Sequence, residues 1–134
     1  MKKLLVVFAI AVLPGCSTLI DSYLMKYDTN EYRIITEIRS DAQSYKSACA
    51  NELMSTTNAI AMADKTRLFM MYSQYQPHNN PVINASTELD KIAQGLKTQY
   101  ASGTKVSPVF CKIKFETIEK SAESIQKIVG DKPR

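Results

Sequence analysis

The chain has 134 residues, which is the size of a single domain, and its 17 basic and 13 acidic side chains give a formal net charge of +4. The charge is slightly uneven, with 8 basic and 9 acidic side chains over 16–101 and 7 and 4 over 105–134. The excess is too small to indicate a nucleic-acid partner, because such partners require a concentrated basic face. One histidine and three cysteines leave little material for a metal or redox centre.

The first fifteen residues have the layout of a secretory signal peptide. Met1-Lys2-Lys3 is a short basic start, an unbroken apolar run follows over 4–13, and Pro14-Gly15 closes it. Ten helical residues rise only about 15 Å, roughly half the hydrocarbon thickness of a membrane, so a permanent spanning helix is the poorer interpretation. We therefore expect residues 1–15 to be cleaved, which removes Lys2 and Lys3 and leaves 15 basic and 13 acidic side chains.

Leu13-Pro14-Gly15-Cys16 resembles the lipobox of bacterial lipoproteins, although Pro14 stands where Ala, Ser or Thr is usual. The thiol of Cys16 is the group that takes a diacylglycerol, Gly15 gives the peptidase room and Leu13 fills an apolar subsite. The resemblance implies cleavage before Cys16 and attachment of several acyl chains, including an N-linked one such as palmitate, which together hold a protein lastingly to a membrane. Because Ser17, and not Asp, follows the cysteine, the resemblance implies the outer membrane, with the domain facing the periplasm.

Residues 16–30 are expected to form the lipidated N-terminus and a tether, or the start of the first helix. From Glu31 apolar residues recur every three or four positions, as on the buried face of a helix. No Gly or Pro interrupts this stretch before Pro77, so it predicts one long helix or two helices with a bend. The residues of the predicted buried face are Ile34, Ile38, Ala42, Tyr45, Cys49, Leu53, Thr56, Ile60 and Ala63.

Residues 77–81, Pro-His-Asn-Asn-Pro, predict a loop. A second helix is expected to begin near Asn84, Ser86 or Thr87 and to end at the Ala-Ser-Gly-Thr segment over 101–104. Its predicted buried residues are Leu89, Ile92 or Ala93, Leu96 and Tyr100.

Ser107-Pro108 has the form of an N-cap followed by proline at the first helical position, so a last helix is expected from this point to Gly130. A strand over 107–115 is the minor alternative, because apolar residues nearly alternate there. Residues 131–134 are expected to be a polar tail. The predicted buried residues of the last helix are Cys111, Phe115, Ile118, Ala122, Ile125 and Val129.

Cys49 and Cys111 remain once Cys16 is assigned to lipid. In an exported protein an even pair predicts a structural disulfide, and the absence of a Cys-x-x-Cys motif speaks against a redox or metal site. The fold expected over residues 31–130 is therefore all-α: a small antiparallel bundle of three to four helices, with Cys49 of the first joined to Cys111 of the last.

The sequence shows no motif for catalysis or for a cofactor. The one histidine, His78, lies in the predicted loop, and no nucleophile elbow, phosphate-binding glycine loop or His-rich metal pattern occurs. We therefore expect a protein without enzymatic activity, cofactor or metal. Met and Tyr suit adaptable interfaces, and the cluster beside the predicted loop is the candidate partner surface: Met70, Met71, Tyr72 and Tyr75.

The function expected from these features is a lipid-anchored protein-interaction module that binds another envelope protein. Helical secretion pilotins are similar in architecture, with a lipobox, a small helical domain and two cysteines, and this similarity implies an adaptor or assembly factor. The alternatives are a phage or prophage lysis or exclusion lipoprotein of the outer spanin type, and a small carrier with a hydrophobic ligand in the bundle.

Overall fold

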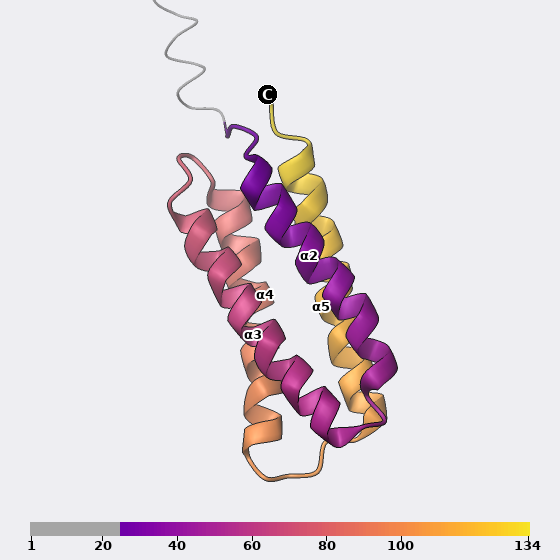
Figure 1. The fold of residues 1–134 in the computed structure, drawn as a ribbon. Coiled ribbons are helices and arrows are strands. Elements are labelled where there is room, and N and C mark those ends of the chain that lie inside the picture. The colour runs from indigo at the N-terminus through magenta and orange to yellow at the C-terminus, as the bar shows by residue number, and fades with distance from the viewer. Residues whose placement is uncertain (1–24) are drawn as a thin grey trace, which may run out of the picture.

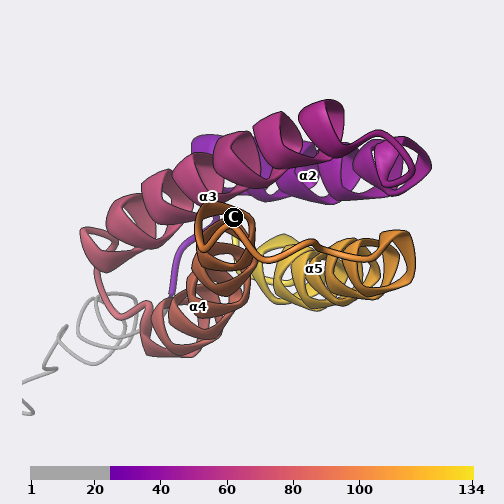
Figure 2. The same cartoon turned by 90° about the horizontal axis from the view of Figure 1, so that it is seen from below.

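The computed structural model describes residues 25–134, which form a four-helix bundle: α2 (Thr29–Tyr45), α3 (Glu52–Gln74), α4 (Asn80–Ala101) and α5 (Pro108–Gly130). The helices run alternately up and down (Figure 1), and this part of the chain contains no strand. Seen from the end, α2 and α3 form one layer and α4 and α5 the other (Figure 2). The predicted all-α antiparallel bundle is confirmed, and the alternative strand over 107–115 is wrong.

Three helices begin with a polar side chain that accepts a hydrogen bond from a backbone N–H three residues later. Asp28 Oδ1 accepts from Glu31 at 2.7 Å, Asn51 Oδ1 from Met54 at 3.0 Å and Ser107 Oγ from Phe110 at 3.1 Å. Such caps satisfy N–H groups that have no partner inside the helix. The predicted Ser107 N-cap is therefore confirmed.

The predicted start of α4 near 84–87 is wrong. The helix begins at Asn80, and Pro81 lies in its first turn, where the missing N–H of proline costs nothing. The loop is accordingly shorter than predicted, and His78 within it has a positive φ of 56°. The asparagines and prolines that marked a loop thus serve largely to start a helix.

The stretch without Gly or Pro contains two helices and not one. A single 3-10 turn, η1 (Lys46–Ala48), follows α2, and the N–H of Asn51 donates to the carbonyl of Ala48 at 2.9 Å before α3 starts. This break shifts the phase of the helical pattern. Of the residues that continue the predicted buried face into α3, Ala63 alone is fully buried.

The core side of α3 carries mostly small residues. Its buried members are Ser55, Ala59, Met62, Ala63, Thr66, Phe69 and Ser73. Two residues that the continued phase predicted as buried are exposed, Leu53 to 78% and Ile60 to 42%, and Thr56 is half-buried. These predictions are wrong because they carried the period of α2 across the break.

The other two predicted helices pack largely as expected. Leu89, Ala93 and Leu96 of α4 are buried, whereas Ile92 and Tyr100 are partly buried against the core. All six residues predicted for the core of α5 are buried, and none is more than 2% exposed.

The predicted disulfide is confirmed. Cys49, directly after η1, is bonded to Cys111 in the first turn of α5, with the two Cα atoms 5.7 Å apart. Both residues are buried in the core cluster. The bond fixes the far end of α2 to the start of α5, at the end of the bundle opposite the start of α2 (Figure 1).

Within residues 25–134 no helix has the length and apolarity needed to cross a membrane.

Candidate interaction surface

α3 is apolar on its outer side as well as on its core side. At 100° per residue, five large apolar side chains fall on the side opposite the core, and their exposure ranges from 42% for Ile60 to 86% for Tyr75. We call them the α3 face: Leu53, Ile60, Leu68, Met71 and Tyr75. At 1.5 Å per residue the α3 face extends about 33 Å, which is the whole length of the helix.

Two of the four residues proposed from sequence belong to the α3 face. Met71 is 51% exposed, and Tyr75 is at the end of the helix. Met70 is half-buried, as is Tyr72, whose hydroxyl donates a hydrogen bond to Asp28 Oδ1 at 2.8 Å. Burial, together with this hydrogen bond, raises the pKa of Tyr72 above its ordinary value. Tyr72 therefore fixes α3 to the start of α2.

Leu53, Ile60 and Leu68 are the surface residues that sequence reasoning missed. The signal was present, because the 52–74 segment has apolar residues at helical spacing on two sides of the helix. A helix with large apolar residues on two sides is normally covered on both of them. Over residues 25–134 the bundle covers only one side of α3, and the other remains exposed.

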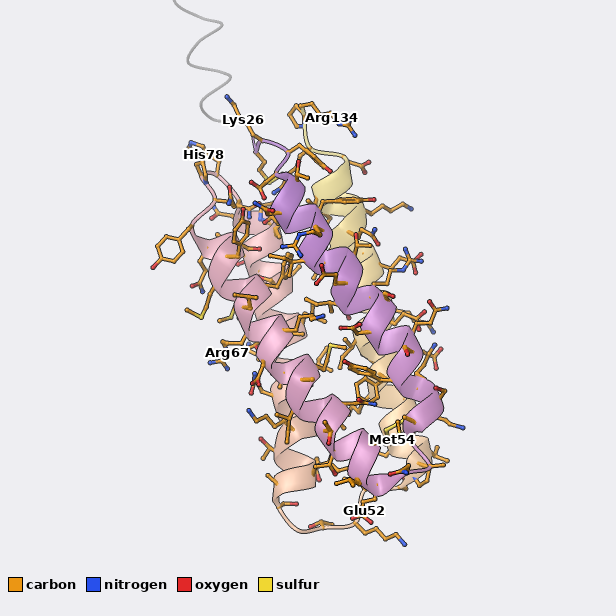
Figure 3. The ribbon with its side chains drawn as sticks, viewed as in Figure 1. Lys26, Glu52, Met54, Arg67, His78 and Arg134 are labelled. Carbon is orange, nitrogen blue, oxygen red and sulfur yellow. A yellow bond between two sulfur atoms is a disulfide. The ribbon has the colours of Figure 1, made fainter. Side chains whose placement is uncertain are left out.

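Two charged residues, Asp64 and Arg67, lie on the same side of α3 as the α3 face, near its middle. The Nζ of Lys97 on α4 lies 3.3 Å from Asp64 Oδ1, and the Nε of Arg67 donates to Asp90 Oδ2 at 2.9 Å. Figure 3 shows Arg67 at the outer edge of α3. Their side chains are 68% and 51% exposed, so both charges reach solvent.

Asp90 connects the α3 face to the rest of the bundle. It is 4% exposed and also accepts hydrogen bonds from Thr66 Oγ1 at 3.1 Å and Gln94 Nε2 at 3.0 Å. Gln94 Nε2 donates in addition to the backbone carbonyl of Ala63 at 2.8 Å. These bonds hold α3 on α4, so the α3 face is presented in one fixed orientation.

A buried polar network closes the end of the bundle at which the N-terminal segment enters. The ammonium of Lys132 donates to Glu31 and, at 2.6 Å, to Asn79 Oδ1, while Asn79 Nδ2 donates to Glu31 Oε1 at 2.6 Å and to the carbonyl of Ser73 at 3.1 Å. The side chains of Lys132 and Glu31 are 1% and 0% exposed. The prediction of a polar tail is therefore wrong for Lys132, because burial with a partner outweighs the polarity of its neighbours in sequence.

The two ends of the described chain are joined at the same place. The N–H of Tyr27 donates to the carbonyl of Pro133 at 2.9 Å, and the guanidinium of Arg134 lies 5.1 Å from the centre of the Tyr27 ring. Figure 3 shows Lys26, His78 and Arg134 together at this end. The start of the described chain is thus held beside the C-terminus.

Ion pairs between helices account for other charges on the surface. Lys65 on α3 lies 2.5 Å from Asp41 and 3.7 Å from Glu37, both on α2. Burial alone would lower the pKa of Lys65, but the hydrogen bond and charge of Asp41, with Glu37, raise it. Arg39 on α2 lies 3.0 Å from Glu123 on α5. These ion pairs therefore join α2 to α3 and α2 to α5.

Shallow hollows lie in the grooves between helices of the described part. One of about 410 Å³ between α2 and α5 has a mostly polar lining that includes Tyr32, Arg39 and Glu123. Another of about 250 Å³ between α4 and α5 has Leu89, Ile125 and Ile128 in its lining. In residues 25–134 no three His, Cys, Asp or Glu side chains are grouped so that they could hold a metal ion.

The proposed lipidation site at Cys16 and its recognition residues Leu13 and Gly15 lie outside the described residues. Comparison of the chain with protein-family models, with curated proteins and with solved structures gave no match.

Proposed function

We propose that this protein is a lipid-anchored envelope protein whose helical domain binds another protein without catalysing a reaction. The sequence Leu13-Pro14-Gly15-Cys16 supports the anchor, and Ser17 supports an outer-membrane location facing the periplasm. The observation that carries the binding role is the exposed α3 face. In this role the domain is an adaptor or assembly factor, similar in architecture to a helical pilotin.

The size and shape of the α3 face support a protein partner. Single exposed apolar side chains are ordinary, whereas five large ones along one side of a single helix, interrupted by Asp64 and Arg67, favour a contact site. Met71 and Tyr75 are of the types enriched at protein interfaces, since one is flexible and the other has a polar tip. Asp64 lies in the middle of the row, where insertion into lipid would require an acidic group to leave water. A protein partner can meet this group with a cation.

Polar groups in the described part support a role without catalysis. Two buried carboxylates join separate parts of the bundle: Asp90 joins α4 to α3, and Glu31 joins α2 to the C-terminal segment. The arrangement favours a rigid surface over a reaction site.

The substitution Ile60→Glu should remove partner binding while the domain stays folded. Ile60 is 42% exposed, so glutamate is tolerated in the free domain, but in a contact it buries an unpaired charge. We expect at least about a tenfold loss of the protein captured with the tagged full-length chain from crosslinked cells, which corresponds to about 1.4 kcal/mol. Quantitative mass spectrometry of the captured material measures it.

Ile113→Glu is the matched control, because Ile113 is 54% exposed on α5, away from α3. It should leave capture unchanged. Equal capture with both variants would refute the α3 face as the contact. A copurifying hydrophobe that neither variant releases would instead support the carrier alternative, and loss of host lysis on deletion would support the spanin alternative.

The substitution Cys16→Ser should abolish the lipid anchor. Serine cannot form the thioether, so incorporation of labelled palmitate should disappear and the chain should leave the membrane fraction or accumulate uncleaved. Cys49→Ser tests the specificity of the effect, because its thiol belongs to the disulfide. Unchanged labelling and fractionation of Cys16→Ser would rule out this anchor.

A further inference from the structure

The α3 face has the spacing of a coiled-coil seam. Within α3, Leu53, Ile60 and Arg67 recur every seven residues, and Thr57, Asp64 and Met71 form the second row of the same seam. Ala61, Leu68 and Tyr75 flank it with a further apolar row. The apolar members of this repeat suit packing along a second helix, and its polar members can fix the register of the two helices.

The charges of the seam make it complementary to itself. If a copy of α3 lies antiparallel, with the two-fold axis between Asp64 and Arg67, each Asp64 faces the Arg67 of the other chain. The same register places Ile60 opposite Met71 on both sides of the axis. A two-fold contact repeats every favourable pair, so this arrangement contains two opposite-charge pairs between two apolar layers. A parallel arrangement would bring Asp64 to Asp64 and Arg67 to Arg67.

Both charged groups can reach such a partner. Arg67 uses its Nε–H for Asp90, and a guanidinium has four further N–H donors. The side chains of Asp64 and Arg67 are 68% and 51% exposed, and Figure 3 places Arg67 on the outside of the bundle. The pairs can therefore form without breaking the contact between α3 and α4.

We propose that a second copy of this chain covers the α3 face, in a two-fold pair with antiparallel α3 helices. This proposal rests on the proposed function, because it requires that the α3 face binds protein. It adds that the partner is a second copy of the chain. In each copy α2 begins at the end of the bundle where α3 ends (Figure 1), so the two described chains begin at opposite ends of the antiparallel pair. Two anchored copies therefore reach one membrane when their helices lie along its surface.

Charge reversal in two differently tagged full-length copies tests the pair. The copies are expressed together, extracted in mild detergent and captured through one tag, and retention of the other copy is measured. Asp64→Arg in both copies should lower retention at least tenfold, because each introduced arginine then faces the Arg67 of the other chain. An Asp64→Arg copy together with an Arg67→Glu copy should restore retention. In this combination the introduced arginine faces the introduced glutamate, and the unchanged Arg67 faces the unchanged Asp64, so both facing pairs have opposite charges.

Retention that is unaffected by Asp64→Arg, or that does not recover in the mixed pair, would overturn the proposal. Arg67→Glu also removes the bond to Asp90, so only copies with an unchanged helical melting curve enter the comparison. Failure here is separable from failure of the proposed function. If Ile60→Glu releases an unlike protein and no copy is ever retained, the α3 face binds protein but the second copy is the wrong partner.

Discussion

Replacing Lys132 with methionine is expected to lower the free energy of unfolding by about 3–5 kcal/mol, a large share of the stability of a domain of this size. Methionine keeps most of the volume but leaves the carboxylate of Glu31 buried without its cation. The measurement is urea denaturation followed by circular dichroism. The melting temperature should fall by more than about 10 °C.

Two further variants make this result specific to the network. The double variant Glu31→Gln/Lys132→Met should recover part of the loss, because it removes both charges and not only one. Lys112→Met removes an exposed lysine of α5 and should change stability by less than about 0.5 kcal/mol. A Lys132→Met protein as stable as the Lys112→Met protein would show that the buried pair adds no stability.

Removal of the disulfide is expected to cost about 4 kcal/mol. Cys49 and Cys111 are 62 residues apart in sequence, and closing a loop of that length restricts the unfolded chain by this amount in the chain-entropy model. The double variant Cys49→Ala/Cys111→Ala avoids a stray thiol and should melt well below the oxidised parent. The comparison is made by thermal denaturation.

The same cross-link predicts how reductant acts. Reductant should lower the melting temperature of the parent toward that of Cys49→Ala/Cys111→Ala and leave the double variant unchanged. A parent that melts at one temperature with and without reductant, while its thiols are shown to be free by alkylation, would mean that the bond does not contribute to stability.

α5 could be predicted from sequence almost residue by residue. Ser107 and Pro108 mark its start, Gly130 its end, and the apolar residues between them keep one uninterrupted period. The disulfide could also be predicted, since only two cysteines remain after Cys16 is assigned. In these cases the determining signals are local in the chain or follow from composition.

α3 could not be predicted in the same way, because its environment depends on a break that has no Gly or Pro. The turn over 46–51 uses Lys, Ser, Ala, Cys and Asn, all of which also occur in helices. Leu53 and Ile60 therefore fitted the period of α2, although they lie on the opposite side of α3 from the core. A shift of phase by a few residues exchanges the buried and the exposed sides of a helix.

The network around Lys132 depends on contacts that sequence spacing does not reveal. Lys132, Asn79 and Glu31 come from three separate parts of the chain and meet only when α2, the α3–α4 connection and the C-terminal segment pack together. By composition alone Lys132 belongs to a polar tail. Burial of a lysine is rare without a partner, and the partner lies 101 residues away in sequence.

The most direct test of the protein-binding role is a photo-crosslinking amino acid placed at Leu68 in the full-length chain in intact cells. Leu68 is 57% exposed in the α3 face, and the same amino acid at Ile113, 54% exposed on α5, is the control. We predict one discrete protein adduct from Leu68, at twice the mass of the chain if the partner is a second copy, and none from Ile113. No adduct from Leu68, or the same weak products from both positions, would contradict a protein-binding role for the α3 face.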